Sequence, residues 1–121
     1  MEITLYNKNG EPVAYIAGDG ENSIYLWSGH AVAYIYEDKI YGWNGRHLGW
    51  FIDGVIYDLS GLRVGFIRSK CPVATYAEPA KYAKYAKYAK YARYAPHAKP
   101  ALSTGYSDQD LEIFLEAGRV G

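Results

Sequence analysis

Between Lys81 and Ala95 the chain reads KYAKYAKYAKYARYA, a basic, an aromatic and a small residue repeated at every third position. Regularly spaced lysines neutralise phosphates, and tyrosines between them stack on bases. This spacing indicates weak, salt-sensitive and non-specific binding of nucleic acid or another polyanion. The alternative is a solvated basic face without a ligand. The candidate binding residues are Tyr82, Lys84, Tyr85, Lys87, Tyr88 and Lys90.

Three tryptophans, Trp27, Trp43 and Trp50, form a second candidate site. They are typical of cross-strand packing, and the alternative is an exposed aromatic platform for a sugar, a base or a proline-rich chain. Extended proline-containing segments dock in aromatic grooves. The stretches YAEPAKYA and PHAKPA could therefore lie on the tryptophans of the same chain or of the next one.

The remaining reactive residue types show no catalytic or metal-binding pattern. The histidines His30, His47 and His97 lack metal-ligand spacing with one another and with Cys71, so we expect them in loops or on the surface. Serines and acids cluster at turns, and the glycines match no phosphate-binding or dinucleotide fingerprint. We expect no enzyme activity, no metal and no cofactor.

The formal net charge is zero, but the charges are segregated. Six basic residues and no acid lie between Pro79 and Ala101, so the rest of the chain carries the balancing negative charge. The lone Cys71 cannot form an internal disulfide, and the sequence shows neither a signal peptide nor a stretch of about 18 apolar residues. We expect a cytoplasmic protein that does not enter the membrane.

Four segments align without gaps: LYNKNGEPVAYI from Leu5, IYLWSGHAVAYI from Ile24, IYGWNGRHLGWF from Ile40 and IYDLSGLRVGFI from Ile56. The last three recur every 16 residues, which fits two short strands and two tight turns. Aromatic residues make up 17% of the chain and most are tyrosines, which favours strands. Each copy therefore predicts a β-hairpin, and together they predict an eight-stranded meander.

The Asn-Gly and Ser-Gly pairs in the middle of each copy predict two-residue turns with positive φ angles. That register places Trp43 opposite Arg46 and Tyr41 opposite Leu48, and a three-residue turn would shift it.

One slot holds only small residues in all four copies: Ala14, Ala33, Gly49 and Gly65. We attribute this restriction to four hairpins that approach one another closely around a common axis. The fold class is therefore all-β, four tandem hairpins in a pseudo-fourfold rosette. The expected divisions are a β domain over 1–72, a triplet-repeat arm over 73–104 and a helical segment over 105–121.

The four aliphatic-Tyr-x3-Gly-x2-[Val/Leu]-[Ala/Gly]-aromatic units, followed by CPVATYAEPA, resemble the bacterial four-fold β-flower family over about residues 1 to 80. The resemblance implies a closed ring of four hairpins, and it implies no particular activity, substrate or cofactor. The tyrosine-rich hairpins are also similar to choline-binding cell-wall repeats, which run slightly longer and follow an export signal.

Alanine occupies every third position of the arm from Ala74 to Ala101. Polyproline II has three residues per turn and would align the Tyr, Ala and Lys positions as three straight faces. Helix propensity favours an α-helix instead, because Ala and Lys are strong helix formers. The sequence leaves open polyproline II or a flexible extended arm on the one hand and a single α-helix on the other, and an extended arm would have to wrap around the body or project from it.

The segment after the arm predicts a short helix that packs on the β domain. Ser107 and Asp110 resemble a capping box, Leu111, Phe114 and Leu115 form an apolar stripe, and Gly118 ends the helix. The whole sequence thus predicts a non-enzymatic structural or binding module. We expect association with a protein partner or with itself through the aromatic surface and the arm, and the alternative is weak polyanion binding by the arm.

Overall fold

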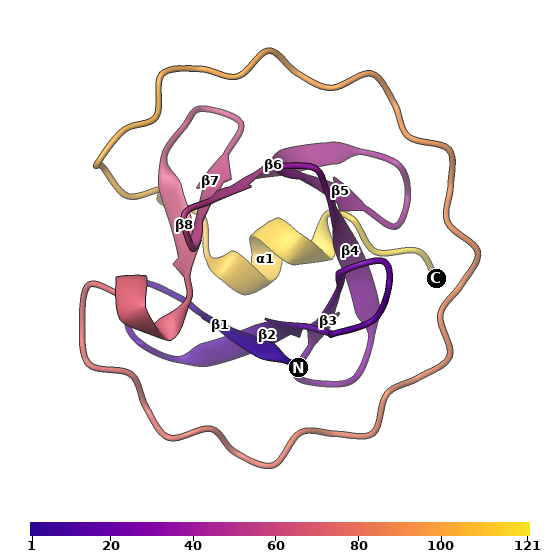
Figure 1. The fold of residues 1–121 in the computed structure, drawn as a ribbon, viewed down its shortest axis with the longest axis horizontal. Helices are drawn as coiled ribbons and strands as arrows, with labels where there is room; N and C mark the ends of the chain where they lie inside the picture. The colour runs from indigo at the N-terminus through magenta and orange to yellow at the C-terminus, as the bar shows by residue number, and fades with distance from the viewer.

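The computed structural model describes residues 1–121 and contains a closed antiparallel barrel with one short helix in its centre (Figure 1). Each strand pairs with the next along the chain, and β8 closes the barrel against β1 through Tyr6 and Phe66. The all-β class and the single C-terminal helix predicted from the sequence are confirmed. The strands are β1 (Ile3–Tyr6), β2 (Pro12–Ile16), β3 (Ser23–Leu26), β4 (Ala31–Tyr36), β5 (Lys39–Gly42), β6 (His47–Ile52), β7 (Val55–Asp58) and β8 (Arg63–Phe66).

The four turns that carry the repeated glycine have the same hydrogen bonds. At the third turn the N–H of Gly42 donates to the carbonyl of Arg46, and the N–H of Gly45 donates back to the carbonyl of Gly42. Gly45 has a φ of +87°, whereas Asn44 does not have a positive φ. This is a three-residue turn closed by a glycine bulge.

The two-residue register expected from the sequence is therefore wrong. Tyr41 pairs with His47, one residue from the predicted partner Leu48, and the register shifts between Ile40 and Tyr41. The same shift occurs in the other three hairpins. The physical reason is that only the glycine adopts a left-handed conformation, so the turn needs one more residue than an Asn-Gly turn of two.

The helix α1 (Leu111–Glu116) lies inside the barrel, where the sequence had predicted only packing on the β domain (Figure 1). Its apolar stripe, Leu111, Phe114 and Leu115, is buried among the inward residues of the strands. The helix begins after Asp110, whose carboxylate accepts from the N–H of Glu112. Ser107 instead accepts a hydrogen bond from the N–H of Gln109, so it does not cap the helix.

The helix also explains part of the slot of small residues. A Cβ at Gly65 would lie 2.8 Å from a methyl carbon of Leu111, and one at Gly49 would lie 3.0 Å from the ring of Phe114. At Gly49 the backbone of β7 adds a closer obstacle, the carbonyl oxygen of Tyr57. Crowding by the central helix and a neighbouring strand, and not by the other hairpins alone, therefore limits size at this slot.

A short 3-10 turn, Arg68–Lys70, follows β8, and residues 71–105 contain neither helix nor strand. The helical alternative for the arm is therefore wrong. This segment runs around the outside of the whole barrel before the chain turns inward to α1 (Figure 1). We call residues 74–103 the belt. No helix of the structure has the length and apolar character that crossing a bilayer requires.

Candidate functional site

The outer face of the barrel consists of aromatic side chains that the belt covers. Tyr15 and Tyr25 stack with their centroids 5.6 Å apart, and Tyr34 and Tyr41 stack at 6.1 Å. All four are buried. Because side chains alternate along a strand, these aromatic residues lie on the outer face of the barrel and the apolar core lies on the inner face. Without the belt they would face solvent.

The belt is held to the barrel by backbone hydrogen bonds at a constant interval. The carbonyls of the four turn glycines, Gly10, Gly29, Gly45 and Gly61, each accept from one belt N–H at 2.9 Å. The donors follow one another at nine-residue steps: Tyr76, Tyr85, Tyr94 and Ser103. Three triplets therefore pass each hairpin before the same contact recurs.

The turn glycines also allow the belt to approach closely. A Cβ at any of the four would collide with the carbonyl oxygen of a belt alanine, and these alanines are Ala74, Ala83, Ala92 and Ala101. The glycines are thus needed twice, for the positive φ of the turn and for contact with the belt.

Two of the candidate tryptophans bind the belt directly. The indole Nε1 of Trp43 donates to the carbonyl of Tyr88 at 2.6 Å, and that of Trp27 donates to the carbonyl of Pro79 at 3.3 Å. Trp43 and Trp50 are buried, and Trp27 is half-buried. Trp43 and Trp50 therefore do not form an exposed platform for an outside ligand.

The candidate lysines point inward to acids and aromatic rings of the barrel. Lys84 pairs with Glu2 at 2.8 Å, Lys87 with Asp19 at 2.7 Å, and Lys90 with Glu21 at 2.7 Å. The ammonium of Lys90 also lies 4.1 Å from the ring centroid of Tyr34 and 5.3 Å from that of Trp43. The methylene groups of the lysines cover apolar surface, and their ammonium groups pair with carboxylates and lie over aromatic rings.

The ion pairs change the titration of their members. A hydrogen bond from Lys84 lowers the pKa of Glu2. Partial burial works to raise the pKa of Asp19, but hydrogen bonds from Lys87 and from Ser23 outweigh it and lower that pKa. Hydrogen bonds from Lys90 and Lys87 lower the pKa of Glu21. These carboxylates are therefore ionised at neutral pH and hold the belt lysines.

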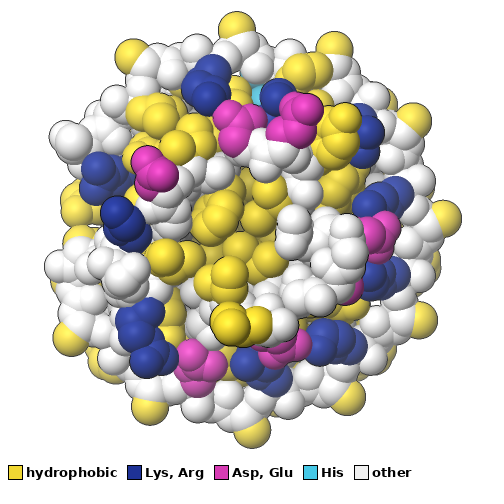
Figure 2. Space-filling model, in the orientation of Figure 1, with side chains coloured by type: hydrophobic (Ala, Val, Ile, Leu, Met, Phe, Trp, Pro, Cys, Tyr) yellow, Lys and Arg dark blue, Asp and Glu magenta, His cyan; other side chains and the backbone are white.

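The tyrosines of the belt remain largely exposed, although the ring of Tyr85 stacks on that of His30 with the centroids 4.2 Å apart. Their exposed fractions lie between 55% for Tyr91 and 70% for Tyr82. Figure 2 shows Lys and Arg side chains inside the outline of the molecule, many of them beside Asp and Glu. We call the six exposed belt tyrosines the tyrosine rim: Tyr76, Tyr82, Tyr85, Tyr88, Tyr91 and Tyr94.

The structure thus separates the candidate residues into two groups. Tyr82, Tyr85 and Tyr88 lie on the rim, while Lys84, Lys87 and Lys90 lie beneath it against the barrel. Tyr76, Tyr91 and Tyr94 occupy the same slot of the triplet, which could have identified them. The acids that pair with the lysines had no comparable signal, because they lie in the N-terminal segment and in loops far along the chain.

One histidine differs from its prediction. His47 is buried at the start of β6, not in a loop or on the surface, and its Nδ1 accepts from the belt N–H of His97 at 2.9 Å. The belt covers the first strand residue after the turn, and this buries the imidazole.

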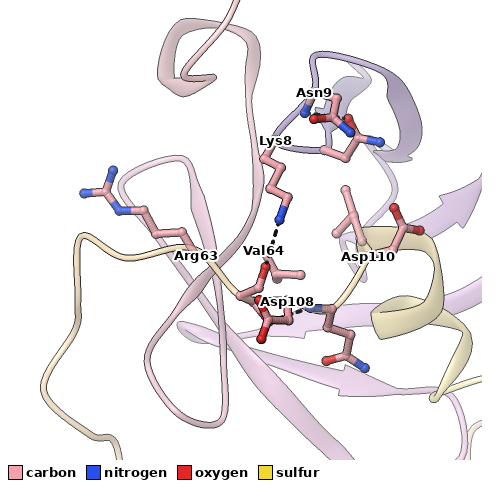
Figure 3. Close-up of a pocket in the computed structure, with 10 residues that line it drawn as sticks. Lys8, Asn9, Arg63, Val64, Asp108 and Asp110 are labelled. Carbon is pink, nitrogen blue, oxygen red and sulfur yellow. Dashed lines mark hydrogen bonds between the residues drawn. The ribbon is translucent and has the colours of Figure 1, made fainter.

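A small cavity of about 90 Å³ lies where the chain enters the barrel, beside Lys8, Asn9, Asp108 and Asp110 (Figure 3). Lys8 donates to the carbonyl of Ser107 at 3.3 Å. Arg63 extends away from Lys8 and Asp108 (Figure 3), so the cavity brings together no set of groups aimed at one ligand.

A family model described as "4-fold beta flower protein" matches residues 3–115 of the chain. No curated protein and no solved structure matches it.

Proposed function

The chain belongs to the 4-fold beta flower family, and we propose that it is a non-enzymatic binding module that associates with proteins, first of all with further copies of itself, through the tyrosine rim. The observation that carries this proposal is that six tyrosines are more than half exposed on a belt anchored at four glycine carbonyls.

Tyrosines suit this role because they supply a large contact area at a small cost in side-chain entropy. Their backbone is already held by the barrel, so association has little further ordering to do. Rigid backbone and exposed aromatic side chains together favour a contact surface over a solvated arm.

Charge favours a second copy as the partner. The belt lysines are matched by barrel acids, and the formal net charge is zero, so two copies do not repel one another over long range. The rim outside these ion pairs carries hydroxyl groups and aromatic rings but no charge.

We also infer a finer architecture: four copies of one hairpin in a pseudo-fourfold arrangement, encircled by a belt of polyproline II type. The four glycine carbonyl contacts at nine-residue steps support it. A helix of three residues per turn would present the lysines inward and the tyrosines outward at every turn.

Polyanion binding by the belt has less support. Each candidate lysine already has a carboxylate partner, so a phosphate would have to displace that partner. Retention of single-stranded DNA on a filter at low salt, lost at moderate salt, would favour polyanion binding over the rim proposal.

Sedimentation velocity of the full chain from micromolar to millimolar concentration tests the proposal. We expect the weight-average sedimentation coefficient of the wild type to rise with concentration. A triple variant, Tyr82→Ser, Tyr85→Ser and Tyr88→Ser, should remain monomeric over the same range. The matched control is Ile113→Ser, which removes an exposed apolar side chain away from the rim and should associate like the wild type.

Two results would contradict the proposal. One is a wild type that stays monomeric at every concentration. The other is a triple variant that associates as strongly as the wild type.

A further inference from the structure

Several backbone N–H groups of the belt donate to the barrel, and among these bonds only the one from His97 has a titratable side chain, His47, as its acceptor. The imidazole Nδ1 of His47 lies 2.9 Å from the backbone nitrogen of His97, and its Nε2 lies 3.0 Å from the carbonyl oxygen of Gly49. The side chain is buried between the barrel and the belt. Both ring nitrogens therefore have a protein partner.

These two partners determine the tautomer. A backbone N–H can only donate, so Nδ1 must be unprotonated to accept from His97. A carbonyl can only accept, so the proton resides on Nε2 and is donated to Gly49. A second proton on Nδ1 would point at the N–H of His97 and would find no acceptor there.

The position of this anchor makes it important for the belt. The preceding backbone contact is the N–H of Tyr94 with the carbonyl of Gly45, and the following one is the N–H of Ser103 with the carbonyl of Gly61. Pro100, between them, has no N–H to donate. Besides His47, an ion pair of Lys99 with Asp38 at 2.7 Å holds this stretch.

Several titratable groups surround His47. The ring of Tyr41 from β5 lies at 5.3 Å and the ring of His97 from the belt at 5.6 Å. Asp38 in the β4–β5 turn and Lys39 at the start of β5 act on it, and Arg46 and Asp58 line a cavity of about 200 Å³ beside it.

Burial lowers the pKa of His47, and the hydrogen bond to Gly49 opposes that effect. The charges of His97 and Lys39 lower it further, while Asp38 raises it. The imidazole is therefore neutral at pH 7, as the hydrogen bonds require.

We propose that His47 is a pH-operated latch, in which protonation of Nδ1 breaks the hydrogen bond to His97 and frees the belt between Tyr94 and Ser103 from the barrel. Its consequence for association rests on the proposed function, because Tyr94 belongs to the rim. The latch itself does not depend on that function.

Proton titration of the ¹⁵N-labelled full chain by NMR tests the latch. At pH 7.5 the imidazole nitrogen shifts of His47 should show a proton on Nε2. As the pH falls below 6.5, exchange of the His97 amide, corrected for the intrinsic pH dependence, should become roughly tenfold faster, as the loss of one hydrogen bond predicts. The amide of Tyr76, bound to the carbonyl of Gly10, should show no such step.

Two variants define the controls. His47→Gln cannot titrate and should abolish the step in His97 exchange, whereas His97→Gln keeps the same backbone N–H and should retain it. If His47→Gln does not fold, the wild-type titration still decides. His47 with its proton on Nδ1, or a His97 amide whose exchange ignores the titration of His47, would overturn the latch.

Sedimentation at pH 7.5 examines the rim without titrating His47. The latch can therefore fail while association through the rim persists, and the reverse can also occur.

Discussion

Single residues in this molecule serve the turn and the belt at once, and Gly29 is the clearest case. Its φ of +99° lies in the left-handed region, and a Cβ there would collide with the carbonyl of Ala83. Its own carbonyl accepts from the N–H of Tyr85. One small residue therefore determines the turn conformation and the distance of the belt.

We expect Gly29→Ala to lower the free energy of unfolding by about 2 kcal/mol or more, since backbone strain and a steric clash add together. Chemical denaturation followed by tryptophan fluorescence measures this loss. Gly20→Ala is the matched control, because Gly20 lies in a loop with no atom within 4 Å of an added Cβ. Equal stability of the two variants would show that the belt does not press on the turn.

Trp43 is the second residue that links barrel and belt. We expect Trp43→Phe to lower the free energy of unfolding by about 1 to 3 kcal/mol, because it removes the donor to the carbonyl of Tyr88 and leaves that acceptor unpaired. Trp27→Phe should cost less, since its hydrogen bond is longer and its side chain more exposed. Urea denaturation compares them, and the reverse order would contradict this account of the belt contacts.

At the scale of elements, the belt depends on ion pairs that acid should weaken. Hydrogen bonds from belt lysines lower the pKa values of three carboxyl groups. Lys84 lowers that of Glu2, Lys90 and Lys87 lower that of Glu21, and Lys99 lowers that of Asp38. Carboxylates with a lowered pKa stabilise the fold above their ordinary values of 3.8 and 4.5. This contribution is lost as the pH falls from those values through the folded pKa values.

We therefore expect the thermal midpoint to fall between pH 5 and pH 3, and high salt at pH 7 to lower it by screening the same pairs. Circular dichroism on heating measures both. Lys87→Gln removes the partner of Asp19 and Glu21 and should show a smaller drop between the two pH values. A drop as large as that of the wild type would mean that other carboxylates cause it.

The helix α1 acts as the core of the barrel. We expect Phe114→Ala to cost about 3 to 5 kcal/mol, because it opens a cavity between the helix and Gly49. On the same helix Ile113 is exposed, and Ile113→Ala should change stability by less than about 1 kcal/mol. Guanidinium denaturation of both variants tests whether α1 is buried along this stripe.

At the scale of the whole molecule, the sequence determines some features and conceals others. The repeated Tyr and Gly positions predict a ring of strands because alternation and turn chemistry are local. The place of α1 was not predictable, since an apolar stripe such as Leu111 to Leu115 shows that a helix is buried but not against which surface. The inward direction of Lys84 was equally hidden, because its partner Glu2 is distant in sequence.

The belt shows the same limit. Its triplets are compatible with an α-helix by propensity, and what decides against a helix is a set of acceptors on other elements, the carbonyls of Gly10, Gly29, Gly45 and Gly61. The sequence predicts His47 in a loop or on the surface, because nothing near it in sequence shows that His97 will cover it. Contacts between distant segments therefore account for most of what the sequence did not reveal.

The match between triplets and hairpins leads to a last prediction about register. Inserting a Lys-Tyr-Ala triplet after Ala89 keeps lysines inward and tyrosines outward, and Tyr91 could take the place of Tyr94 at the carbonyl of Gly45. Inserting one alanine at the same point turns every later lysine and tyrosine to the wrong face unless the belt bulges.

We expect the single insertion to lower the free energy of unfolding by about 2 to 3 kcal/mol through lost hydrogen bonds. Each kcal/mol lowers the thermal midpoint by roughly 4 °C. The triplet insertion should lower the free energy of unfolding by less than half as much. Calorimetry gives the midpoints, and trypsin cleavage after the belt lysines should follow the same order. An equal loss for both insertions would mean that the three-residue period does not hold the belt in register.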